Sequence, residues 1–292
     1  MTLSLSPLTA IVTGAGGGLG RSHALALARH GARAVVNDLS EEAATRVAKE
    51  ITAAGGEAMP FAANVTDETA VAAMVTATTD RWGSVDILVN NAGILRDKSF
   101  AKMDLADFRL VLEIHLMGAA ICAKAVWDQM RTQGFGRIVF TTSSSGLYGN
   151  FGQSNYGAAK MGLVGLMQTL ALEGERYGIH VNCLAPSAAT GMTETIFSDD
   201  DFARLSPDLV SPAVVALCGR DAPTRRILLA GAGSFEQANI TMTRGIYLGE
   251  GEDVATALAD RLDQVADRDG EVIPATGFDQ FQWEIRKSGV TA

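Results

Sequence analysis

The sequence has few of the residues that would indicate a metal centre, a disulfide framework or a nucleic-acid surface. Its 292 residues include three cysteines and four histidines, and neither set has a metal-ligand spacing. We therefore expect no metal site, and the odd, dispersed cysteines are typical of reduced thiols in a cytoplasmic protein. The net charge is −9, so we expect no binding to nucleic acid or to an acidic membrane surface.

Long apolar runs are also scarce. None is long enough to predict a transmembrane helix, and the N-terminus lacks the basic segment and apolar run of a signal peptide. The last residues, Val290, Thr291 and Ala292, differ from the Ser-Lys-Leu type of peroxisomal address. Because 47% of residues are hydrophobic and 20% charged, the composition indicates an ordinary globular enzyme, which we expect to be cytoplasmic.

A glycine-rich turn near the N-terminus lies between an apolar strand-like run, residues 8–12, and an Ala/Leu-rich helical run, residues 21–30. Glycines allow a tight turn and a close approach of the backbone to a pyrophosphate, whose charge suits a helix N-terminus. This order of elements predicts a dinucleotide site. The residues of the turn that we assign to it are Gly14, Gly17, Gly18, Leu19 and Gly20.

A second strand-like run, residues 34–38, ends in Asp38, about twenty residues after the glycine turn. A carboxylate in this position can accept hydrogen bonds from the ribose hydroxyls of NAD and would repel the 2′-phosphate of NADP. We therefore predict NAD as the cofactor, with Leu39 in the same binding set. Arg21 or Arg33 could swing toward this pocket and weaken the preference.

Tyr156 and Lys160 lie four residues apart in an Ala/Gly-rich helical run and so share one helix face. Taken alone, this spacing is more often an ordinary helical pair. A close ammonium favours a phenolate, so Lys160 could lower the pKa of Tyr156 by about three units, which needs roughly 4 kcal/mol. Ser143 follows the strand-like run 137–142, where its hydroxyl can bond a substrate oxygen. Together these groups suit proton transfer at an alcohol or ketone.

The sequence resembles the short-chain dehydrogenase/reductase family, over about residues 8–235, in three motifs that occur in the family's order. They are Thr13-Gly14-x-x-x-Gly18-x-Gly20, Asn90-Asn91-Ala92-Gly93 and Ser143…Tyr156-x-x-x-Lys160. The alternation of strand-like and helix-like runs agrees with an α/β fold, and we expect a single doubly wound Rossmann-type domain with a seven-stranded parallel sheet. The resemblance implies catalysis by Ser143, Tyr156 and Lys160. It also implies cofactor contacts at Asn64, Val65, Asn91, Ala92, Gly93 and Pro186, although Asn64 replaces the usual aspartate and Ser187 the usual glycine.

Residues 90–100, 145–156 and 191–195 resemble more closely the (3R)-hydroxyacyl-CoA dehydrogenase domains of multifunctional β-oxidation enzymes. This resemblance implies NAD-dependent oxidation of a (3R)-hydroxyacyl-CoA to the 3-oxoacyl-CoA. A hydroxysteroid dehydrogenase of the 17β type is the alternative within the enzyme class. Outside that class stand an NAD-binding regulator and a structural or interaction protein.

The same resemblance assigns residues to a substrate site. Arg96, Lys98 and Lys102 could meet the phosphates of coenzyme A, although a solvated loop paired with Asp97 and Asp104 is equally compatible with the residues alone. The acyl side would be lined by Leu147, Tyr148 and Phe151.

His115 lies in a long helical run, residues 105–131, where relatives usually have an asparagine that holds a proton-relay water. A histidine on an apolar face is often a satisfied core residue, but imidazole can also pass protons near neutral pH. Both roles stay open for His115.

We divide the chain into a catalytic domain, residues 1–235, and a C-terminal extension, residues 236–292, that packs on this domain or on a partner subunit. Residues 187–205 lack a clean period and are expected to form a substrate lid, or else a surface loop. Residues 119–123 and 161–167 are apolar around much of the helix, which predicts a homodimer or homotetramer.

Overall fold

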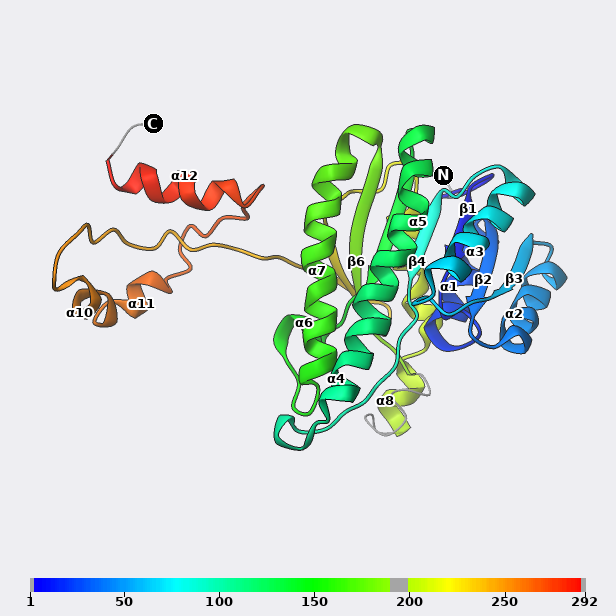
Figure 1. Ribbon diagram of the computed structural model, residues 1–292, viewed down its shortest axis with the longest axis horizontal. Helices are drawn as coiled ribbons and strands as arrows, with labels where there is room; N and C mark the ends of the chain where they lie inside the picture. The colour runs from blue at the N-terminus through cyan, green and yellow to red at the C-terminus, as the bar shows by residue number, and fades with distance from the viewer. Residues whose placement is uncertain (1–2, 190–198, 290–292) are drawn as a thin grey trace. The chain divides into compact units, whose positions relative to one another are not determined.

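The computed structural model describes residues 3–189 and 199–289. The chain divides into two compact units, Met1–Gln237 and Ala238–Ala292. The first unit holds a sheet whose strand order is β3-β2-β1-β4-β5-β6-β7-β8. Figure 1 labels five of these strands, in the order β3, β2, β1, β4 and β6 across the sheet. The strands are β1 Thr9–Val12, β2 Arg33–Asp38, β3 Ala58–Ala62, β4 Ile87–Asn90, β5 Gly136–Thr141, β6 Ile179–Ser187, β7 Ile227–Gly231 and β8 Ser234–Ala238.

The strands from β3 to β7 pair in parallel, and the order reverses between β1 and β4, so the fold is the expected doubly wound one. β1, β4 and β5 are buried along their whole length, and each has an apolar run of three residues at its centre or end. The sheet has eight strands where we expected seven. Ala232 and Gly233, both with positive φ, form the short connection that adds β8 beside β7.

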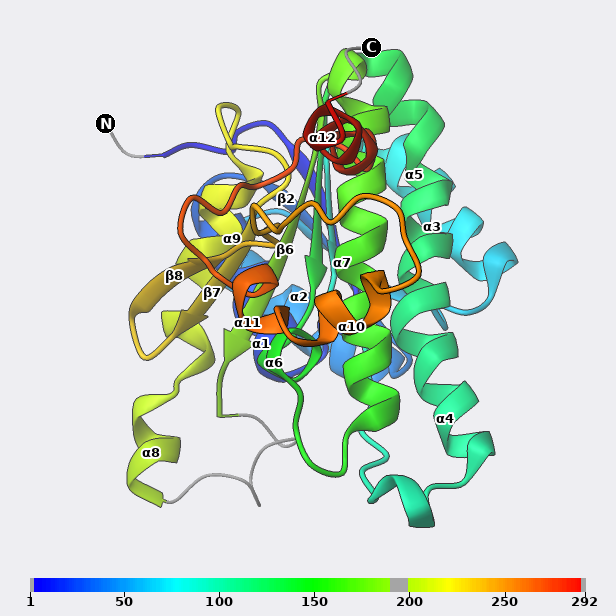
Figure 2. The same ribbon diagram turned by 90° about the vertical axis from the view of Figure 1, so that its left-hand side faces the viewer.

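Helices cover both faces of this sheet. Figure 2 shows α9 on one side of the sheet and α3, α5 and α7 on the other, and α1 packs against α9 and α2. Ser40, Asp67 and Asp104 cap α2, α3 and α4 with side-chain oxygens that accept backbone N–H bonds. The helices of this unit are α1 Gly18–Arg29, α2 Glu41–Ala53, α3 Glu68–Trp82, α4 Leu105–Leu112, α5 Gly118–Gln133, α6 Ser144–Tyr148, α7 Ser154–Gly174, α8 Asp199–Arg204 and α9 Ser211–Cys218, with short 3-10 turns at Phe100–Lys102, Glu175–Tyr177 and Pro207–Leu209.

The long helix expected over residues 105–131 is not regular. A π-helical turn, Glu113–Met117, separates α4 from α5, and His115 lies within it. Within the described residues, the combined run Leu105–Gln133 is long and apolar enough by length and composition to cross a membrane, contrary to the sequence prediction. This is weak support for a span, since a core helix passes the same test, and this run packs against α3, α7 and the sheet.

The second unit contains α10 Val254–Ala259, α11 Leu262–Val265 and α12 Phe278–Lys287. An antiparallel bridge between Met242 and Val272 joins its two halves. Trp283 of α12 donates from its indole N–H to the carbonyl of Arg244 at 3.2 Å.

Candidate active site

The glycine turn lies at the carboxyl end of β1 and leads directly into α1. Gly14 and Gly18 have positive φ values of 61° and 50°, a backbone region that favours glycine. A Cβ on Gly14 would lie 2.8 Å from the Ala92 Cα, and a Cβ on Gly20 would lie 2.2 Å from the Gly14 carbonyl oxygen. Gly14 is therefore required both by its backbone conformation and by close packing, Gly18 by its conformation, and Gly20 by close packing.

Thr13 and Asn91 tie this turn to the end of β4. The Thr13 hydroxyl accepts bonds from the backbone N–H groups of Asn91 and Ala92 at 3.0 and 3.1 Å. The Asn91 amide donates in return to the carbonyls of Thr13 and Gly14. The predicted cofactor residues Asn91, Ala92 and Gly14 are thus brought together, and Thr13 joins them.

The N-terminus of α1 fits a pyrophosphate. No side chain of the described residues caps this helix, so its first backbone N–H groups are left for another acceptor such as a phosphate. Gly17 is exposed, and a Cβ on it would meet nothing within 4 Å. The open backbone donors and the absence of side chains are what a dinucleotide site requires.

Asp38 lies beside the same turn. Its Oδ2 accepts from the Gly16 backbone N–H at 2.9 Å, and its Oδ1 accepts from the Ser40 N–H at 3.1 Å. The two arginines named as risks are engaged elsewhere, because Arg21 pairs with Glu50 and Arg33 with Glu57. The sequence did not single out Arg46, whose Nη2 donates to the Gly16 carbonyl at 2.9 Å.

The other predicted cofactor residues lie at the same edge of the sheet. Val65 is buried, Leu39 and Asn64 are exposed, and Pro186 is part of β6, where it pairs with Ala230 of β7. The Asn64 side chain accepts from the Thr66 N–H at 3.1 Å, so its oxygen is already engaged within its own loop.

Ser143, Tyr156 and Lys160 meet where β5 ends. Ser143 caps α6, and its Oγ accepts from the Ser145 N–H at 3.1 Å while it also hydrogen-bonds to the Tyr156 phenol. Tyr156 and Lys160 lie one turn apart in α7, and the Lys160 Nζ is 5.4 Å from the Tyr156 ring centre. That ammonium donates to the Thr141 carbonyl at 2.5 Å. The helical pair and the serine thus share one site, as the sequence predicted.

The electrostatics of this group differ from the prediction. Burial raises the pKa of Tyr156 above its usual value, while the bond from Ser143 lowers it and the charge of Asp97 raises it. Burial also lowers the pKa of Lys160 to about 7. In the protein without cofactor, burial of both side chains therefore outweighs the lowering of the Tyr156 pKa that we expected from Lys160.

His115 packs edge-on against the Tyr156 ring, with ring centres 5.2 Å apart. Its Nε2 lies 3.0 Å from the Ile94 nitrogen and 2.7 Å from the Ile94 oxygen. Burial, reinforced by the nearby charge of Lys160, lowers the pKa of His115 to about 3. The imidazole is therefore neutral near pH 7, and the π turn directs it into the site.

A small cavity of about 10 Å³ lies between these residues, and its lining includes Thr13, Asn90, His115 and Lys160. Among the described residues, the Asn90 Nδ2 and the His115 Nδ1 are buried and have no hydrogen-bond partner. The cavity has room for about one water molecule. Thr13 and Asn90 belong to motifs that the sequence showed, but their convergence on His115 depends on the tertiary fold.

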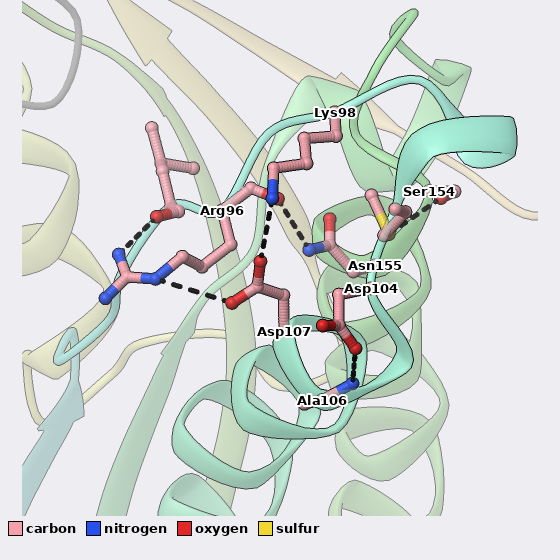
Figure 3. Close-up of polar contacts among 9 residues, drawn as sticks. Arg96, Lys98, Asp104, Ala106, Asp107, Ser154 and Asn155 are labelled. Atoms are coloured by element: carbon pink, nitrogen blue, oxygen red, sulfur yellow. Dashed lines mark hydrogen bonds and ion pairs between the residues drawn. The ribbon is translucent and has the colours of Figure 1, made fainter.

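The predicted substrate residues do not converge on one point as the catalytic residues do. Arg96 and Lys98 both reach Asp107 of α4, at 3.8 and 3.4 Å, as Figure 3 shows. Their carboxylate partner is therefore neither Asp97 nor Asp104, the partners named in the solvated-loop alternative. Asp104 instead caps α4. In the part of the chain that the structure describes, Lys102 has no ion pair.

The three residues assigned to the acyl side have very different exposure. Leu147 is half-buried in α6, whereas Tyr148 and Phe151 are 68% and 94% exposed. The expected lid, residues 187–205, lies partly outside the described residues, and its described part includes α8.

Comparison with known proteins agrees with this geometry. The family model described as short chain dehydrogenase matches residues 8–201. The chain belongs to the short-chain dehydrogenase family and is an enzyme of the dehydrogenase/reductase type, so the predicted family and fold class are confirmed.

Within that family, the chain is similar to peroxisomal multifunctional enzymes. It is 44% identical over 258 residues to peroxisomal multifunctional enzyme A of Dictyostelium discoideum, covering 85% of this chain and 58% of that protein. The full-length peroxisomal multifunctional enzyme type 2 of Drosophila melanogaster superposes with a TM-score of 0.82 at 36% identity, covering 98% of this chain and 51% of that one. The chain thus spans about half the length of these relatives.

A smaller relative is similar over nearly its whole length. A 7α-hydroxysteroid dehydrogenase, solved with NADH and 7-oxo glycochenodeoxycholic acid, superposes with a TM-score of 0.74 at 30% identity. The match covers 79% of this chain and 95% of that one.

Proposed function

We propose that the chain oxidises a secondary alcohol to a ketone with NAD, and that its substrate is a (3R)-hydroxyacyl-CoA. The observation that carries this proposal is the meeting of Ser143, Tyr156 and Lys160 at the carboxyl edge of the sheet that also holds the glycine turn and Asp38. The similarity to multifunctional enzymes supports the acyl-CoA substrate, and the NADH of the steroid dehydrogenase supports the cofactor.

The glycine turn and the α1 N-terminus would hold the pyrophosphate of NAD, and Asp38 would hold the adenosine ribose. Gly93, Asn91 and Pro186 would border the nicotinamide end. Bound NAD would supply the hydride acceptor. The negative Asp38 gives the preference for NAD over NADP.

Ser143 would donate its hydroxyl to the substrate oxygen, and the Tyr156 phenol would take the hydroxyl proton. Because both Tyr156 and Lys160 are buried, the phenolate forms at least cost while the Lys160 ammonium is beside it. A water in the small cavity would bond the Asn90 amide, His115 and Lys160. It would take up the proton that leaves Lys160 when Lys160 recovers a proton from Tyr156, which restores the phenolate. His115 is proposed as the acceptor in this relay, through its Nδ1.

The test is the appearance of reduced nicotinamide when NAD is mixed with (3R)-hydroxyacyl-CoAs and with free hydroxysteroids. Tyr156→Phe keeps the ring but removes the proton carrier, so turnover should fall by at least about a hundredfold. Tyr177→Phe, in the 3-10 turn that follows α7, is the control and should keep full turnover. If Tyr156→Phe binds NAD and retains its turnover, another group is the base.

The runner-up is a hydroxysteroid dehydrogenase, favoured by the steroid-bound relative. The double change of Lys98 and Lys102 to alanine separates the two. With a coenzyme A thioester as substrate, the double variant should raise KM by up to about fivefold per lysine at low salt. With the pantetheine thioester, which lacks the phosphates of coenzyme A, KM should stay the same. Lys49→Ala on α2 is the control. If a free hydroxysteroid is turned over far better than any hydroxyacyl-CoA, and the lysine changes do not alter KM, the protein is a hydroxysteroid dehydrogenase. If the protein binds NAD but turns over no alcohol, an NAD-binding regulator is favoured.

Assembly and location belong to the same proposal. We propose a homodimer or homotetramer, with the C-terminal unit packed on the catalytic domain or on a partner subunit. A cytoplasmic location is tested by fractionating cells that express a tagged copy.

A further inference from the structure

Two loops that frame Tyr156 are joined by backbone and side-chain bonds. One loop, residues 93–99, follows β4, and the other, residues 149–153, precedes α7. The Lys98 N–H donates to the Gly152 carbonyl at 2.9 Å. The Asn155 amide donates to the Arg96 carbonyl at 2.9 Å, a bond drawn in Figure 3. The first loop is therefore fixed against the start of the helix that carries Tyr156.

A chain of polar side chains runs through this junction. The Gln153 Nε2 donates to the Asp97 Oδ2 at 2.6 Å, while its Oε1 accepts from the Ser145 hydroxyl at 2.8 Å. The Asn150 amide donates to the same hydroxyl at 3.1 Å. Gln153 and Ser145 are 8% and 6% exposed, so breaking either bond would leave a buried polar group without a partner.

The chain ends at the reacting groups. The Ser145 backbone N–H donates to the Ser143 Oγ at 3.1 Å, which leaves the Ser143 proton free to point toward Tyr156. Asp97 acts on Tyr156 through its charge and raises the pKa of the phenol. Asp97 thus reaches the catalytic tyrosine both by bonds and by electrostatics.

We propose that Asp97, Gln153 and Ser145 form a positioning clamp that holds Ser143 and Tyr156 in register for the proton transfer. This inference rests on the proposed dehydrogenase function. Asp107 pairs instead with Arg96 and Lys98, so it has no part in the clamp.

The groups that face Tyr156 come from four elements. Lys160 lies one turn further along α7, His115 packs on the ring from the π turn, Ser143 bonds the phenol from the α6 cap, and Asp97 approaches from the loop after β4. His115 is neutral near pH 7, and among these groups the charge of Asp97 is the one that raises the pKa of Tyr156. Removing the Asp97 charge should therefore lower the pKa of the phenol.

Three variants separate the charge from the hydrogen bonds. Asp97→Asn keeps an oxygen that accepts from Gln153 but loses the charge, so the pH profile of kcat/KM should move down by about half a unit with little change in its maximum. Asp97→Ala also loses the bond, and its maximal kcat should fall by about tenfold. Gln153→Met keeps the charge and should lower kcat without moving the profile down. Asp107→Asn is the matched control and should do neither.

A second readout does not depend on turnover. Proteins labelled with ¹³C at the tyrosine Cζ are titrated with NAD bound, and the Tyr156 signal is assigned by its loss in Tyr156→Phe. The phenol of Asp97→Asn should ionise at a lower pH than that of the wild type or Asp107→Asn. Equal titration curves and equal pH profiles in these proteins would overturn the clamp, even if hydroxyacyl-CoA oxidation is confirmed. If no hydroxyacyl-CoA is oxidised, the proposed function fails, while the titration still decides the role of Asp97.

Discussion

Gly93 provides a sharp test of how the site is packed, because the His115 ring occupies the space that a side chain would need. A Cβ built on Gly93 would lie 2.1 Å from the His115 Cε1 and 2.8 Å from its Nδ1. The ring cannot withdraw freely. Its Nε2 is held at the Ile94 backbone, and its edge rests on Tyr156.

The cost of Gly93→Ala follows from these contacts. Two carbons need about 3.5–4.0 Å, so the imidazole must move by more than about 1 Å. Overpacking a core of this kind costs about 1–3 kcal/mol, and losing the bond to Ile94 adds about 1 kcal/mol. We expect Gly93→Ala to lower the free energy of unfolding by about 2–4 kcal/mol, and to lower kcat because the Tyr156 ring loses its support.

Urea unfolding followed by circular dichroism measures this change. Gly165→Ala in α7 is the control, because a Cβ there meets nothing within 4 Å and its φ is not positive. The same added methyl should stabilise that variant by about 0.5–1 kcal/mol, and light scattering checks that each variant keeps its assembly mass. An unchanged urea midpoint and turnover for Gly93→Ala would show that His115 does not occupy this position.

Three further predictions concern the cofactor, the pH and the assembly. Asp38→Asn keeps a bond to the glycine turn but loses the charge. The value of kcat/KM with NAD, divided by the value with NADP, should therefore fall by about tenfold or more. A wild-type protein that uses both cofactors equally well would contradict the role of Asp38. Burial lowers the pKa values of His23 and His115 to about 3 in the folded state, whereas the unfolded chain protonates near pH 6.5. Below pH 6.5 the unfolded state therefore binds more protons than the folded state. The free energy of unfolding is full above that pH and falls as the pH drops, by about 2 kcal/mol per histidine at pH 5. Urea titrations at pH 7 and pH 5 should show that His23→Asn removes about half of this loss, and an equal loss in the wild type and in His23→Asn would refute the assignment. The apolar faces of α5 and α7 predict at least a dimer, which a monomer mass by light scattering at micromolar concentration would disprove.

Local sequence signals determined the glycine turn, most of the strands and the pairing of Tyr156 with Lys160. These features depend on short spacings, since glycines define a turn, continuous apolar runs define buried parallel strands, and a spacing of four residues defines a helix face. The caps at Ser40, Asp67 and Asp104 are also local. For this reason, the family and the doubly wound fold could be predicted before any coordinates.

The tertiary structure alone decided what lies around those residues. The π turn that directs His115 at Tyr156, the pairing of Arg96 and Lys98 with Asp107, and the eighth strand have no short-range signature. The direction of the Tyr156 and Lys160 pKa shifts also escaped the sequence, because it depends on how completely the folded chain removes both groups from water. The approach of Asp97 to Tyr156, across 59 positions of chain, is of the same kind: residues distant in sequence become neighbours only when the sheet brings the ends of β4 and β5 side by side.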